Sequence, residues 1–135
     1  FTDNNMSKNV SVLVVDDDEV ACRGIKKGLE ENTGFAAKTA LDGASAIKMA
    51  ETEHFDVVIV DLVMPGMNGV ETCRGIKKVS PGTEVVLLSG FPSEVEKLQM
   101  SFIEAGGKDL YIRKPLLAGE IAEAITKLLK EKRGD

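Results

Sequence analysis

Five short, largely apolar runs recur along the chain, and they constrain the fold more than any other feature of the sequence. They lie at residues 10–15, 35–40, 57–60, 85–88 and 110–112. A strand that is buried on both faces lacks the alternation of apolar and polar residues found in a half-exposed strand, so each run predicts a strand. We therefore expect a sheet with both faces covered.

A segment with apolar residues at helical spacing follows each of these runs. The helices are expected around residues 20–31, 46–50, 70–76, 95–105 and 117–128, and the last of them has the cleanest amphipathic stripe. Turn-forming residues such as Gly34, Asp42-Gly43 and Pro81-Gly82 separate the segments. Strands that alternate with helices predict an α/β fold with a parallel sheet between two layers of helices.

The length of 135 residues fits one domain, and no linker or repeat divides the chain. We expect this domain at residues 10–131, between a disordered or non-native N-terminus at 1–9 and a tail at 132–135. The net charge of −5 argues against nucleic-acid binding, which normally needs a basic face. Because no run is long enough to span a membrane and no signal peptide is visible, we expect a cytoplasmic protein.

The two cysteines, Cys22 and Cys73, match no metal-binding spacing. Each falls within a helical pattern, which predicts a small buried or half-buried residue. His54 is the single histidine, and we interpret it as an ordinary polar residue before a strand.

Polar residues that could carry chemistry follow the ends of four predicted strands. They are Asp16, Asp17, Asp61, Ser89 and Lys114. In an open parallel sheet, ligands bind outside the carboxyl ends of the strands, so these side chains are expected to converge on one crevice. A carboxylate there can attack a phosphoryl group if a divalent cation and a lysine neutralise the charge. Magnesium prefers such hard oxygen ligands.

Four segments together resemble the signature segments of the receiver domain of two-component response regulators. They are VLVVDDDE (12–19), VVIVDLVMPGMNGVE (57–71), VVLLSG (85–90) and LYIRKP (110–115). The resemblance extends from about residue 10 to residue 130. It implies a flavodoxin-like (βα)5 fold with a doubly wound, five-stranded parallel sheet in the strand order 2-1-3-4-5.

The resemblance also implies a role for each matching position. Asp61 corresponds to the phosphoacceptor, and Asp16 and Asp17 correspond to the acidic pair that holds Mg²⁺ together with Asp61. The position of Val63 is the one whose backbone carbonyl also binds the metal in this family.

Further roles follow from the same comparison. Ser89 and Lys114 correspond to the residues that contact the phosphoryl group, and Ser89 with Tyr111 to the pair that switches conformation. Val63 and Phe91 occupy positions that tune the lifetime of the phosphoryl group. Neither side chain can orient a water molecule, so we expect slow self-dephosphorylation.

The family implies a signalling phosphoacceptor rather than an enzyme. Its expected partners are a sensor histidine kinase or a histidine phosphotransfer protein, and either a separate output partner or an output domain outside this sequence. The fourth helix, the fifth strand and the last helix would form the switching face, with a phosphorylation-dependent homodimer as one outcome. We expect no nucleic acid bound by this chain and no membrane partner.

Two other interpretations remain open from the residues. Asp16-x-Asp18-x-Val20 also fits the DxDx(T/V) pattern of haloacid-dehalogenase-type phosphatases, in which Asp16 would be the nucleophile. That family needs a further acidic pair after its lysine, and only a predicted helix follows Lys114. The second alternative is a binding module that is never phosphorylated. Asp18 and Glu19 are interpreted as the start of the first helix.

Overall fold

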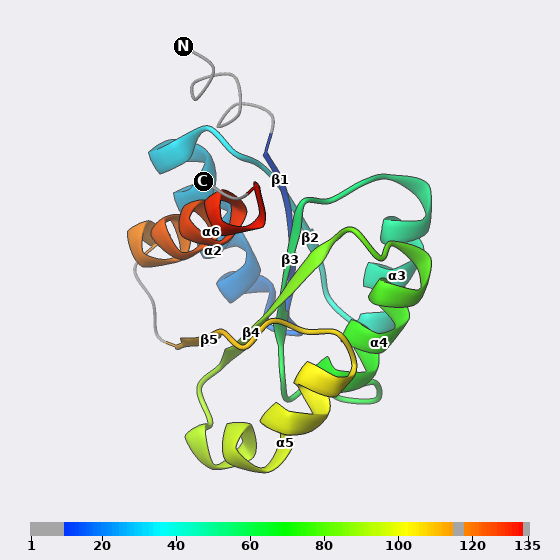
Figure 1. Cartoon of the computed structure of the whole chain (residues 1–135). Coiled ribbons are helices and arrows are strands. Elements are labelled where there is room, and N and C mark those ends of the chain that lie inside the picture. Colours follow the sequence, from blue (N-terminus) through cyan, green and yellow to red (C-terminus); the bar gives the residue numbers. More distant parts are fainter. Residues whose placement is uncertain (1–9, 115–117, 134–135) are drawn as a thin grey trace.

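The computed structural model describes residues 10–114 and 118–133, and it shows a five-stranded sheet between two layers of helices (Figure 1). The strands are β1 (Ser11–Val15), β2 (Ala36–Ala40), β3 (Val57–Asp61), β4 (Glu84–Ser89) and β5 (Tyr111–Arg113). The helices are α2 (Glu19–Thr33), α3 (Gly43–Thr52), α4 (Gly69–Val79), α5 (Pro92–Glu104) and α6 (Ala118–Arg133). All ten predicted elements are confirmed, with small shifts at their ends.

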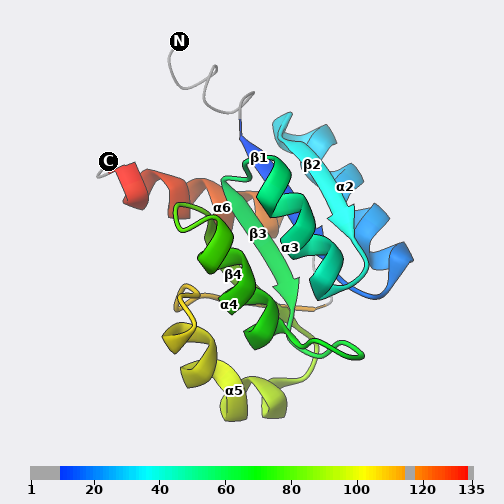
Figure 2. The ribbon, with the colours of Figure 1, turned by 90° about the vertical axis from the view of Figure 1, so that its right-hand side faces the viewer.

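All strands pair in parallel, in the order β2-β1-β3-β4-β5, as expected. Helices α2 and α6 cover one face of the sheet, and α3, α4 and α5 cover the other (Figure 2). Consecutive side chains of a strand point to opposite faces of the sheet. Val12 and Val14 therefore pack in the core between the sheet and helices α2 and α6, whereas Leu13 and Val15 pack in the core on the side of α3, α4 and α5. The two cores together explain why the strands need apolar residues at every position.

Local sequence signals fix where the helices begin and end. Asp18 is the N-cap of α2, and its side chain accepts hydrogen bonds from the backbone N–H groups of Val20 and Ala21. Gly34 ends the same helix with φ at 75°, a left-handed conformation that favours glycine. The interpretation of Asp18 as a helix start is therefore confirmed. A capping box formed by Asn68 and Glu71 at the start of α4 was not predicted.

The described residues include neither end of the chain. The segments 1–9 and 115–117, and residues 134–135, lie outside the described residues, so the predicted disorder of 1–9 is not addressed. Helix α6 continues to Arg133, past the predicted domain end at 131. Within 10–114 and 118–133, no helix combines the length and hydropathy required to cross a bilayer.

Candidate functional site

The sheet register brings the two buried acids together at the carboxyl ends of neighbouring strands. Val15 of β1 pairs with Val60 of β3, so Asp16 and Asp61, the next residues of each chain segment, emerge side by side. Asp16 is completely buried and Asp61 is 5% exposed, whereas Asp17 is exposed. One carboxylate oxygen from each of the three residues lies within 4.8 Å of the others. The predicted convergence of these acids is confirmed.

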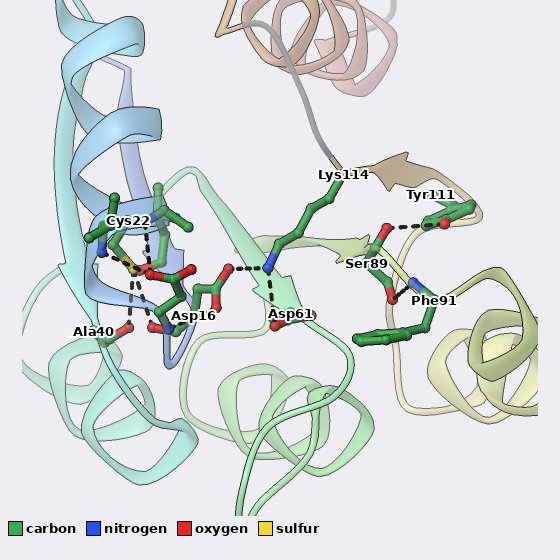
Figure 3. Close-up of polar contacts among 12 residues, drawn as sticks. Asp16, Cys22, Ala40, Asp61, Ser89, Phe91, Tyr111 and Lys114 are labelled. Atoms are coloured by element: carbon green, nitrogen blue, oxygen red, sulfur yellow. Dashed lines mark hydrogen bonds and ion pairs between the residues drawn. The ribbon is translucent and has the colours of Figure 1, made fainter.

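Lys114 joins this acidic group from the end of β5, the edge strand next to β4 (Figure 3). Its Nζ donates to Asp16 Oδ2 and lies 3.3 Å from Asp61 Oδ2. At neutral pH the group thus carries three carboxylates against one ammonium, a formal excess of two negative charges. A divalent cation would balance that excess.

The electrostatics of the site reflect burial as well as pairing. Burial and the neighbouring charge of Asp16 raise the pKa of Asp61 to about 6, although Lys114 opposes the shift. Burial alone would lower the pKa of Lys114, but its hydrogen bond to Asp16 and the charges of both acids raise it instead. The Asp61 carboxyl group therefore ionises at a higher pH than an ordinary aspartate, beside a lysine that keeps its positive charge.

Backbone contacts hold Asp16 firmly. Its N–H donates to the carbonyl of Ala40 at the end of β2 (3.1 Å), and its Oδ1 accepts from the N–H of Asp18 (3.0 Å). The Cys22 thiol donates to the Asp16 carbonyl oxygen (3.3 Å) from the first turns of α2. Both cysteines are buried and free, as expected, but no sequence pattern indicated that Cys22 touches an acidic residue of the site.

Ser89 connects the site to β5. Its carbonyl accepts hydrogen bonds from the Lys114 N–H (3.0 Å) and the Tyr111 hydroxyl (3.1 Å), and its Oγ accepts from the Phe91 N–H (3.0 Å). Ser89 is fully buried and stands one residue beyond Leu88, the register partner of Asp61. The predicted switch residues Ser89 and Tyr111 therefore touch each other directly.

The two positions expected to tune lifetime lie in loops at the same end of the sheet. Val63 is 41% exposed, two residues after Asp61, and Phe91 is 57% exposed, two residues after Ser89. Exposed apolar side chains of this size are few in the described chain, and these two flank buried polar residues. They present no hydrogen-bonding group to solvent beside the acids.

The acidic residues fit a hard divalent cation. Carboxylate oxygens from three residues and an exposed member, Asp17, suit Mg²⁺, which keeps several waters and takes few protein ligands. The buried Asp16 and Asp61 would bind from within the sheet while Asp17 faces the solvent. Nothing in this donor set suits a soft metal, because it offers only oxygen.

Comparison with known proteins agrees with this arrangement. Residues 12–126 match the response regulator receiver domain family. The transcriptional regulatory protein TcrX of Mycobacterium tuberculosis is 33% identical over 90% of this chain and 50% of its own length. The regulator of alkaline phosphatase synthesis, PhoP, of Bacillus subtilis is 30% identical over 90% of this chain and 49% of its own. The chain thus spans about half the length of the curated relatives it matches.

Solved structures lead to the same family. A CheY-like receiver from Methanospirillum hungatei superposes with a TM-score of 0.85 at 27% identity, covering 93% of this chain and 98% of that one. The BeF3-activated receiver of DrrB, a protein of Thermotoga maritima, gives 0.75 at 29% identity, covering 90% and 98%. The chain therefore belongs to the receiver-domain family of two-component response regulators.

This membership removes the phosphatase alternative. In the structure, the Asp18 carboxylate is engaged in capping α2, and the acid that accompanies Asp16 is Asp61 on the neighbouring strand. The DxDx(T/V) match in this chain combines a buried strand-end acid, Asp16, with the helix cap Asp18.

Proposed function

We propose that the chain accepts a phosphoryl group from a histidine kinase or a histidine phosphotransfer protein onto Asp61. The observation that carries this proposal is the contact of Lys114 with both Asp16 and Asp61 inside a three-carboxylate group. An attacking carboxylate and a phosphoryl group repel each other, so positive charge has to be fixed beside Asp61 before transfer. Lys114 supplies part of that charge.

The transfer would form a bond between an Asp61 oxygen and phosphorus while the bond from phosphorus to the donor imidazole breaks. The imidazole nitrogen keeps the bonding electron pair, so no general base is needed. A bound Mg²⁺ would supply the remaining positive charge, held by Asp16, Asp17, Asp61 and the Val63 carbonyl. Ser89 and Lys114 would then contact the new phosphoryl oxygens.

The output would travel from Ser89 to the face formed by α5, β5 and α6. Tyr111 donates to the Ser89 carbonyl, so a movement of Ser89 toward a phosphoryl group changes the hydrogen bond that holds Tyr111. An open groove of about 500 Å³ follows β5; it is lined by Leu110, Tyr111, Ile112, Arg113, Lys114, Glu120 and Ala124. This groove begins at a site residue and is the expected place for a partner or a second receiver.

Intact-mass measurement after incubation with acetyl phosphate and Mg²⁺ tests the proposal. We expect the addition of one alkali-labile phosphoryl group to the wild type and none to Asp61→Asn. Asp56→Asn is the matched control, since Asp56 stands just before β3 at the opposite end of the strand and should leave phosphorylation intact.

Other outcomes would contradict the proposal in distinct ways. Modification that persists in Asp61→Asn but disappears in Asp16→Asn would move the nucleophile to Asp16. No modification of the wild type by acetyl phosphate, and no binding of the phosphoryl analogue BeF₃⁻, would identify a binding module that is never phosphorylated.

A further inference from the structure

Cys22 is a buried thiol for which the phosphoryl-transfer chemistry has no use. It is the fourth residue of α2 and 1% exposed, enclosed by the ends of β1 and β2. Its S–H group is a weak hydrogen-bond donor.

The surroundings of this thiol are unusually rich in backbone acceptors. Its Sγ lies 3.3 Å from the carbonyl oxygen of Asp16 and 3.9 Å from those of Val14 and Ala40 (Figure 3). These carbonyls mark the ends of β1 and β2. The same Ala40 carbonyl also accepts the Asp16 N–H, so the thiol lies where the two strand ends and α2 meet.

We propose that Cys22 is a positioning residue for the metal site, acting through the Asp16 backbone. The thiol contact on its carbonyl and the Ala40 contact on its N–H restrict rotation of the Asp16 backbone at the strand end. Its carboxylate is then directed to Asp61 and Lys114, within reach of the other two acids. The inference rests on the proposed function because it presumes that Asp16 binds Mg²⁺.

Cys73 provides an internal control with matching chemistry. It is also buried and free, burial raises its pKa to about 11, and its Sγ lies 3.9 Å from a backbone carbonyl, that of Ala105. It lies in α4, however, and contacts none of the acids. Losing either thiol should cost similar packing, whereas only the loss of Cys22 should affect the metal site.

Calorimetric titration with Mg²⁺ separates the two roles. We expect Cys22→Ala to weaken Mg²⁺ binding about three- to tenfold, less than the loss typical for a partner of a ligating side chain, because the contact is to the backbone. Cys22→Ser keeps a donor and should restore most of the affinity. Cys73→Ala should bind as the wild type does.

Two results would overturn the inference in different ways. A wild type that binds Mg²⁺, with Cys22→Ala binding as tightly as Cys73→Ala, would reduce Cys22 to a packing residue. A wild type without any Mg²⁺ binding would overturn the metal site of the proposed function, and this inference with it.

A second measurement uses the unaltered chain, so it does not depend on the folding of any variant. Alkylation of each cysteine by iodoacetamide is followed by peptide mass spectrometry with and without Mg²⁺. We expect Mg²⁺ to slow labelling of Cys22 by a larger factor than labelling of Cys73. Equal slowing of both would indicate a global gain in stability alone and would contradict the proposal.

Discussion

Asp61 is the residue where function and stability oppose each other. The side chain must be buried beside Asp16 to lie in the acidic site, and that burial makes its charged form costly. Lys114 offsets only part of this cost. The proposed phosphoacceptor therefore destabilises the folded state when its carboxylate is ionised.

This opposition predicts a pH-dependent gain in stability for Asp61→Asn. The pKa of Asp61 is raised from 3.8 to about 6, so the folded state favours the protonated form, and ionisation costs the wild type stability as the pH rises through this interval. Asparagine avoids that loss. After allowance for screening by solvent, the gain should be on the order of 1 kcal/mol at neutral pH and above, and should vanish near pH ~4.

Urea unfolding in buffer with a chelator checks this prediction. Glu51→Gln, which removes one negative charge from an exposed position in α3, is the control and should show no comparable gain. A gain in the free energy of unfolding of Asp61→Asn that is as large at low pH as at neutral pH would refute the electrostatic explanation.

The Val63 side chain allows a second prediction, which concerns the lifetime of the phosphoryl group. The exposed Val63 side chain, two residues after Asp61, has no hydrogen-bonding group that could orient water, so under the proposed function it would shield an acyl phosphate on Asp61. Val63→Asn introduces an amide that can hold an attacking water, so the phosphorylated protein should lose its phosphoryl group about three to ten times faster. Decay followed by intact mass measures this, with Val79→Asn, an exposed valine at the end of α4, as the control. Unchanged decay in Val63→Asn would count against a tuning role.

Helix α4 begins directly against the backbone of Asp61 and Leu62. Gly69 is its first residue, and its N–H donates to the Leu62 carbonyl (2.9 Å). A Cβ at this position would lie 2.8 Å from both the Asp61 carbonyl oxygen and the Leu62 Cα. Because both are backbone atoms, the helix or the strand end would have to move.

We therefore predict opposite effects for two glycine-to-alanine changes in helices. Gly69→Ala should destabilise the fold by about 1–3 kcal/mol through overpacking and should also slow phosphorylation of Asp61. Gly24→Ala in α2 meets no atom within 4 Å, so it should stabilise by about 0.5–1 kcal/mol through helix propensity. Chemical denaturation measures both, and a stabilised Gly69→Ala would disprove the close approach.

The positions of the strands and helices could be predicted from the sequence, but the contacts between these elements mostly could not. The apolar runs gave all five strands because a strand buried on both faces leaves an unambiguous pattern. Asp18 was recognised as a cap because capping depends on neighbours in sequence. The Cys22–Asp16 contact and the two hydrogen bonds to the Ser89 carbonyl were not predicted. They form only where residues from separate strands and helices come together in the fold.

In the whole molecule, the acidic site joins strand ends that are far apart in the sequence. Asp16 and Lys114 are separated by 98 positions and still make a direct ion pair. A ligand that bridges the three acids would thus cross-link the ends of β1 and β3, next to the lysine that follows β5. Binding to the folded state alone must stabilise it.

Mg²⁺ should accordingly raise the melting temperature, and a chelator should reverse the increase. At ten times the dissociation constant the stabilisation is about 1.4 kcal/mol. Asp17→Asn should remove most of the effect while leaving the buried pair in place, because Asp17 is the exposed member. Thermal melts at matched ionic strength, with K⁺ in place of Mg²⁺, exclude general screening. An identical rise in Asp17→Asn would argue against this site.

The alternation of strands and helices, and hence the identity of the residues at strand ends, can be predicted from the amino-acid sequence alone. Those properties follow from local periodicity and from the rule that ligands of a parallel sheet lie at its carboxyl edge. Three features became visible only in the packed fold: Asp16 is fully buried, Lys114 bridges it to Asp61, and the Cys22 thiol contacts its backbone carbonyl. Burial, ion pairing and the pKa of Asp61 depend on distances between elements, and strand register and packing set those distances.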